Sequence, residues 1–148
     1  MTLSPRPLPI ALALLAAALC AAPAGAELAK WDQARVTQIA QQLTEASNAW
    51  WTALREQPDV FGAALAPKAQ VLEEQSRSLA GHLAKGKGHD QTRDMYLSLK
   101  EIADDTEVEA QRAELDEPTL AAWAKVADLL RQLAPYYDPK ALEETGQG

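Results

Sequence analysis

The chain has few of the residues on which many enzymes and metalloproteins depend. Its 148 residues include one cysteine, Cys20, and two histidines, His82 and His89. Because Cys20 lies in the apolar N-terminal stretch, the remainder has no cysteine for disulfides, thiolate nucleophiles or covalent haem attachment. There is also no glycine-rich phosphate loop and no His-Glu-x-x-His zinc motif. These absences exclude several kinds of site and assign no function.

An excess of positive charge is also lacking. The sequence has 14 lysines and arginines against 21 aspartates and glutamates, a net charge of −7. Only Arg6 among these residues precedes Glu27, so the chain from Glu27 onward carries a net charge of −8. Nucleic acids and anionic membranes are bound through basic surfaces. We therefore expect neither as a partner.

One long apolar run is present, at the N-terminus. Arg6 precedes an apolar stretch over residues 8–22, which is followed by Pro23 and the small residues Ala24-Gly25-Ala26. This order is typical of a secretory signal peptide, and about 15 apolar residues are too few to cross a bilayer. The sequence predicts a signal peptide over 1–26, cleaved after Ala26, a periplasmic protein and no membrane span after processing. Lipidation at Cys20 is an alternative, disfavoured by the bulky Leu19 before it, and a retained anchor is another.

From residue 27 onward the sequence has the pattern of helices. Val, Ile and Thr are scattered, and no run of them is long enough for a buried strand. Helices are predicted over about 28–57, 66–84, 90–114 and 118–135, with Asp90 and Asp116 or Glu117 as N-caps. A capping box at Thr106 to Glu109 allows a restart within the third. The breaks between the helices are marked by Pro58 and Pro67, Gly86 and Gly88, Pro118, and Pro135 with Pro139.

Each predicted helix has one apolar face, and short connections favour antiparallel neighbours. The sequence therefore predicts an all-α, up-down-up-down four-helix bundle over residues 27–137, followed by a flexible tail over 138–148. The predicted core is Val36, Ile39, Leu43, Ala46, Trp50, Ala53 and Leu54; Ala69, Leu72, Leu79 and Leu83; Met95, Leu99, Ile102, Thr106 and Ala113; and Leu120, Trp123, Val126, Ala127, Leu130, Leu133 and Ala134.

Acidic residues are concentrated in and after the third predicted helix. Between residues 101 and 117 there are eight acids and one base, Arg112. A solvated face is the simpler interpretation, and an acidic strip that receives a basic partner is the functional one. A calcium site is not predicted, because the sequence has no Asp-x-Asp-x-Asp-Gly loop. The predicted acidic strip consists of Glu101, Asp104, Asp105, Glu107 and Glu109.

Tryptophan is the second feature that indicates binding. Trp50 and Trp123 fall on the apolar faces, so we expect them in the core. Trp51 lies about 100° further round its helix and must face a flank. A flank aromatic often belongs to an interface. The residues that could form an apolar docking patch are Trp51, Phe61, Tyr136 and Tyr137.

Metal or haem binding needs more converging ligands than the sequence offers. The grouping of His82, His89, Asp90 and Asp94 matches no common spacing of metal ligands. In architecture and compartment the chain resembles the b562-type and c′-type haem bundles. Their methionine in the first helix, histidine in the last helix and Cys-x-x-Cys-His motif are all missing here. Met95 and His82, on adjacent predicted helices, are the one pairing that leaves haem open.

The sequence predicts an exported, non-enzymatic bundle that acts as a protein-interaction or adaptor module. Its partner would be a periplasmic or envelope protein, bound by the acidic strip and the flank aromatics, with no cofactor. The exposed carboxylates lack the apolar pocket that acid–base catalysis needs. The alternative is a carrier of a small ligand, haem or metal in a cavity between the helices, where alanines leave room. An apolar pocket with a few convergent polar groups would favour the carrier, and a close-packed interior the interaction module.

Overall fold

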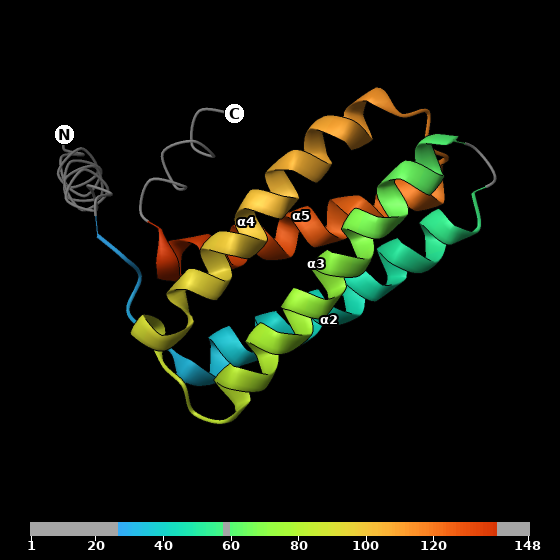
Figure 1. The fold of residues 1–148 in the computed structure, drawn as a ribbon. Helices are drawn as coiled ribbons and strands as arrows, with labels where there is room; N and C mark the ends of the chain where they lie inside the picture. Colours follow the sequence, from blue (N-terminus) through green and yellow to red (C-terminus); the bar gives the residue numbers. More distant parts are fainter. Residues whose placement is uncertain (1–26, 58–59, 139–148) are drawn as a thin grey trace, which may run out of the picture.

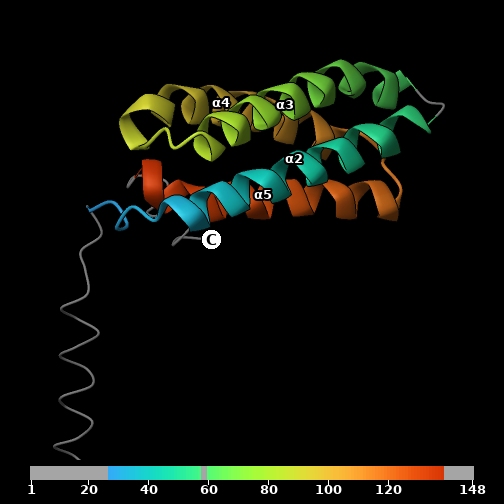
Figure 2. The same ribbon diagram turned by 90° about the horizontal axis from the view of Figure 1, so that it is seen from below.

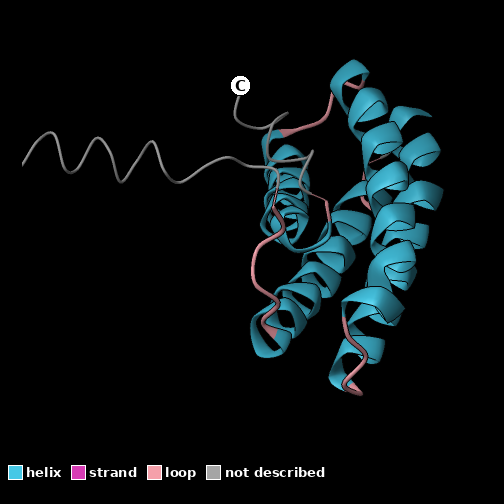
Figure 3. Ribbon diagram, turned by 90° about the vertical axis from the view of Figure 1, so that its left-hand side faces the viewer, coloured by secondary structure: helices cyan, strands magenta, loops and turns pink. Residues whose placement is uncertain are grey.

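The computed structural model describes residues 27–57 and 60–138. Its helices are α2 (Gln33–Arg55), α3 (Val60–Ala84), α4 (His89–Arg112) and α5 (Glu117–Tyr137) (Figure 1). The described residues contain no strand (Figure 3). The all-α prediction is therefore confirmed. The predicted signal peptide, 1–26, and the predicted tail beyond Asp138 lie outside the described residues.

Consecutive helices pack with antiparallel contacts. α2 lies between α3 and α5, and α4 lies diagonally across from α2. Seen from below, α3 and α4 form one layer over α2 and α5 (Figure 2). The α2–α3 pair packs most closely and the α4–α5 pair least closely. Within the described ranges, no helix is both long and apolar enough to span a bilayer.

Side-chain caps set the N-termini of α2 and α5. The carboxylate of Asp32 accepts a hydrogen bond from the backbone N–H of Arg35, and that of Asp116 accepts one from Thr119, both at 3.0 Å. Hydrogen bonds from the Thr119 side chain and backbone hold the pKa of Asp116 below its ordinary value. Pro118 lies in the first turn of α5, where a missing N–H costs nothing. The prediction of Asp116 as a cap is confirmed.

The prediction of Asp90 as the N-cap of α4 is wrong. The N-cap is Gly88, whose N–H donates to the Gln91 side chain at 3.0 Å and whose carbonyl accepts from Thr92 Oγ1 at 2.8 Å. No side chain among the described residues accepts from the first-turn N–H groups of α4 as the sequence expected of Asp90. α4 is then continuous to Arg112, because the Thr106 hydroxyl donates to the Ile102 carbonyl inside the helix and caps nothing.

Two prolines that were expected to mark helix ends lie inside helices. α3 begins at Val60 and runs through Pro67, and α5 runs through Pro135 to Tyr137. Pro67 is exposed and lies within α3, where its missing N–H removes one hydrogen bond of the helix. The Pro135 carbonyl accepts a hydrogen bond from the Ala29 N–H at 2.8 Å, and Tyr137 is buried. Tertiary packing thus outweighs the local preference of proline.

The apolar faces of α2 and α3 are buried as predicted, apart from the half-buried Ala53. In α5, Trp123, Leu130 and Leu133 are buried, but Leu120 is 45 % exposed. In α4 the buried face is turned by about one residue from the predicted one. Tyr96 is buried there while Met95 is only half-buried, because the Tyr96 ring stacks on Tyr137 with centroids 4.7 Å apart. The apolar core residues that the sequence missed are Ala40, Leu65, Ala80, Tyr96, Ala103, Ala110, Leu115, Leu129 and Tyr137. Thr92 is also buried, whereas the predicted Ile102, Ala113 and Ala127 are only half-buried.

Candidate functional site

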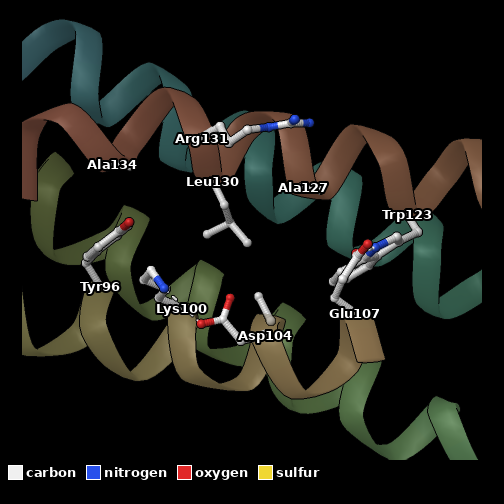
Figure 4. A pocket seen from close by; sticks show the side chains of 10 residues that line it. Tyr96, Lys100, Asp104, Glu107, Trp123, Ala127, Leu130, Arg131 and Ala134 are labelled. Atoms are coloured by element: carbon white, nitrogen blue, oxygen red, sulfur yellow. Dashed lines mark hydrogen bonds and ion pairs between the residues drawn. The ribbon is translucent and has the colours of Figure 1, made fainter. Parts of the chain in front are cut away.

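A cleft of about 340 Å³ lies between α4 and α5, where the helices pack least closely. α4 lines it with Tyr96, Lys100, Ala103, Asp104 and Glu107. α5 lines it with Trp123, Ala127, Leu130, Arg131 and Ala134. Figure 4 shows the Leu130 side chain pointing between the two helices. Alanines on both walls leave space that larger side chains would fill.

One end of the cleft is closed by Trp123 and Glu107. The indole Nε1 of Trp123 donates a hydrogen bond to the Glu107 carboxylate across the two helices. Trp123 is 6 % exposed, and its ring also packs on Trp50 with centroids 5.2 Å apart. Both residues are thereby held in place, and Glu107 is half-buried in spite of its charge.

The other end is formed by Tyr96, Lys100 and Asp104. The Lys100 ammonium lies 2.8 Å from the Asp104 carboxylate, one turn further along α4. Tyr96 is buried and its ring stacks on Tyr137. Antiparallel packing places these residues opposite Arg131 and Ala134 of α5 (Figure 4). This end therefore carries two cations and one carboxylate.

Arg131 differs from the other charged residues of the cleft. It is exposed, and it forms no hydrogen bond or ion pair with any residue of the described part of the chain. A guanidinium has five N–H donors and no acceptor. The cleft thus combines an apolar floor, two engaged carboxylates and one arginine whose donors face solvent.

The predicted acidic strip does not form one surface. Asp104 and Glu107 face α5 in the cleft. Glu109 faces α3 and lies 3.5 Å from the Lys68 ammonium, and Asp105 borders a small groove on the same side. Glu101 is exposed. The strip is divided between two sides of α4.

The predicted aromatic patch is not assembled either. Trp51 is half-buried on α2, diagonally across from α4, and the Arg55 guanidinium lies 4.9 Å from its ring centroid. Tyr136 and Tyr137 lie at the opposite end of the molecule, because α2 and α5 run antiparallel. The side chain of Phe61 lies outside the described set. Trp51 and the acidic strip therefore lie apart.

A cluster of aromatic rings joins the start of α2, the start of α4 and the end of α5. Trp31 packs edge-on against Tyr137 at 5.5 Å and against His89 at 5.7 Å, and His89 stacks on Tyr137 at 5.6 Å. The hydroxyls of Tyr137 and Thr92 are hydrogen bonded at 2.8 Å. Burial raises the pKa of Tyr137 above its ordinary value of 10.0. We interpret this cluster as structural, because Trp31, His89 and Tyr137 line none of the grooves described above and the cluster joins the start of α2 to the end of α5.

No group of three or more histidine, cysteine or acidic side chains in residues 27–57 and 60–138 is placed to hold a metal ion. His89 Nδ1 lies 2.8 Å from Asp90, and His89 Nε2 is buried without a partner among the described residues. His82 Nδ1 donates to the Ser78 carbonyl at 2.8 Å, which leaves Nε2 as its one possible ligand atom. Met95 lies with Asp94 in a shallow groove between α3 and α4. None of these residues lines the α4–α5 cleft.

Four residues of the cleft were missed from the sequence: Tyr96, Lys100, Ala103 and Arg131. Comparison with models of protein families, with curated proteins and with solved structures finds no match for this chain. Its function is therefore inferred from the chemistry of its own residues.

Proposed function

We propose that this chain is a non-enzymatic binding protein that holds a small amphipathic molecule in the cleft between α4 and α5. The observation that carries the proposal is the composition of the cleft. Ala103, Ala127 and Leu130 provide an apolar floor, and charged side chains border it from both helices. Small-molecule sites in helical bundles combine these features, and a volume of about 340 Å³ is within their usual range.

The two carboxylates of the cleft both have partners within the protein, and this supports binding better than catalysis. Glu107 accepts a hydrogen bond from Trp123, and Asp104 is paired with Lys100. The described lining contains no histidine, serine or cysteine that would act as base or nucleophile. Each acid thus already has a partner within the protein, and the Glu107 bond joins the two walls of the cleft.

The cleft is tested with a matched pair of alanines on α5. Ala127 lines the cleft, whereas Ala124 is exposed outside it. Ala127→Phe fills the space between the helices, and Ala124→Phe adds the same side chain to the surface. With anilinonaphthalene sulfonate as the probe, we expect saturable binding that Ala127→Phe abolishes and Ala124→Phe retains. Equal binding by both variants would place the probe elsewhere and refute the cleft as the site.

A protein-interaction module is the second candidate. Glu101 and Asp105 are exposed on α4, and neither forms an ion pair within the described part of the chain. These two acids are available to a basic partner on the outer side of the molecule. The double variant Glu101→Lys with Asp105→Lys leaves the cleft residues unchanged. If this function is right, the variant loses partners that the parent chain captures from its own periplasmic extract. An unchanged set of partners would remove this function.

We also propose that the protein is exported, with residues 1–26 as a cleaved signal peptide. The support is the order of the segments: Arg6, the apolar stretch over residues 8–22, and Ala24-Gly25-Ala26. The intact mass of protein recovered from the periplasm is then that of a chain that begins at Glu27. A mass that includes Cys20 with attached acyl groups would indicate a lipoprotein. A full-length mass would contradict cleavage.

A further inference from the structure

The charged groups of the cleft differ in how their hydrogen-bonding capacity is used. Of the two acids, Asp104 lies 2.8 Å from the Lys100 ammonium and Glu107 accepts from the Trp123 indole. A ligand with a cationic head group would compete with Lys100 and Trp123 for these two carboxylates. Each carboxylate therefore attracts a cation less strongly than an acid without a donor from the protein would.

The Arg131 guanidinium, unlike the two carboxylates, has hydrogen-bonding groups that no described residue uses. Its nearest acid along α5, Asp128, accepts a hydrogen bond from Gln132 at 2.9 Å. Arg131 has no partner of its own within the described residues, and its five N–H donors are accessible at the rim of the cleft. Figure 4 shows its side chain extending along α5 in the direction of Ala127. The Arg131 guanidinium, whose N–H groups have no acceptor among the described residues, therefore lies beside the apolar lining of the cleft.

We propose that the ligand of the cleft is an amphipathic monocarboxylate, with its carboxylate on Arg131 and its apolar body against Ala127, Leu130 and Ala103. This inference rests on the proposed binding function and names the ligand class. A guanidinium matches a carboxylate through two parallel N–H···O bonds, which are stronger than neutral hydrogen bonds. The apolar body removes the alanine and leucine surfaces of the cleft from water.

The charge of the molecule restricts the head group further. The chain carries a net charge of −7, and Asp104 and Glu107 stand in the cleft itself. A single arginine neutralises one negative charge. A phosphate monoester brings nearly two and would meet greater repulsion from these carboxylates. A monoanion is therefore favoured over a dianion.

The test compares four probes that share a ten-carbon chain, with the full processed chain as the protein. Decanoate, decanol, decyl phosphate and decyltrimethylammonium are titrated by calorimetry, and binding at the cleft is checked with Ala127→Phe. We expect decanoate to bind most tightly. Arg131→Gln should weaken decanoate binding about tenfold or more, because a hydrogen bond to a charged group is lost, and leave decanol binding unchanged.

Two further variants separate the site from bulk charge and from folding. Lys125→Gln removes one positive charge from the exposed surface of the same helix and should leave decanoate binding within about twofold of the parent. Arg131→Lys keeps the charge without the planar donor pair, so its loss of affinity should lie between those of the parent and Arg131→Gln. Circular dichroism checks that each variant is folded.

The outcomes distinguish this inference from the function on which it rests. Equal binding of decanoate and decanol, or tightest binding of decyltrimethylammonium or decyl phosphate, would overturn the carboxylate inference and leave the cleft as a binding site. Equal loss of decanoate binding in Lys125→Gln and Arg131→Gln would also overturn it. If none of the probes binds, or if Ala127→Phe binds them unchanged, the proposed function itself is wrong.

Discussion

The indole N–H of Trp123 donates a hydrogen bond to the carboxylate of Glu107, and this bond joins α5 to α4 at one end of the cleft. Glu107 belongs to the predicted acidic strip, yet its carboxylate points inward between two helices. Trp123 belongs to the predicted core, yet it also forms a wall of the cleft. Glu107 was expected to face a partner and Trp123 to fill the core. Together they fix the geometry of one end of the cleft.

This bond predicts how two substitutions at residue 107 differ. Glu107→Ala leaves the Trp123 N–H without its acceptor and should lower the free energy of unfolding by about 1–2 kcal/mol. Glu107→Gln retains an acceptor and should cost less. Urea unfolding measures both. Glu109→Ala is the control, because Glu109 forms only a part-exposed pair with Lys68 at 3.5 Å and such pairs contribute less than about 1 kcal/mol. Equal losses in Glu107→Ala and Glu109→Ala would contradict the role of Glu107.

The raised pKa of Tyr137 predicts a loss of stability at alkaline pH. Above pH 10.0 the unfolded chain gives up the phenolic proton while the folded chain retains it, because burial raises the pKa of Tyr137. Unfolding then releases a proton, so stability falls as the pH rises. Tyr137→Phe lacks this dependence. The stability difference between the parent and Tyr137→Phe should therefore shrink between about pH 9 and pH 11. Parallel curves from thermal unfolding over this range would show that Tyr137 contributes nothing to the pH dependence.

The position of Pro67 predicts a substitution that stabilises the protein. A proline in a helix interior costs about 3 kcal/mol relative to alanine, and alanine returns about 0.4–1 kcal/mol of freedom to the unfolded chain. Because Pro67 is exposed inside α3, Pro67→Ala should raise the free energy of unfolding by about 2–2.6 kcal/mol. Pro118→Ala is the control, because its N–H has no helical acceptor in the first turn of α5. A gain in Pro118→Ala but not in Pro67→Ala would refute this explanation.

The helices and much of the core could be predicted because spacing alone determines them. Val36, Ile39 and Leu43 recur with the helical period, and all three are buried. In α4 the period allows more than one face. Met95 and Tyr96 are neighbours, and the contact with Tyr137, 41 residues away in the sequence, decides that Tyr96 is the buried one. Such a contact leaves no signal in the local pattern.

The cleft could not be predicted from the sequence. Alanines such as Ala103 and Ala127 are compatible with two helices in close contact and equally with a gap between them. Which of these forms depends on the separation of α4 and α5, which the sequence does not specify. Lys100 and Arg131 are isolated bases that belong to no sequence motif. Only the fold shows that both line the same cleft. The acidic strip is divided for a related reason: Asp104 and Asp105 lie about 100° apart on the helix, so Asp104 faces α5 and Asp105 borders α3.

The most direct test of the central claim is native mass spectrometry of the protein purified from its own cells. The proposed function predicts one small molecule bound per chain, retained in Ala124→Phe and absent from Ala127→Phe. A chain that carries no small molecule, or an Ala127→Phe variant that keeps the same bound mass as the parent, would contradict it.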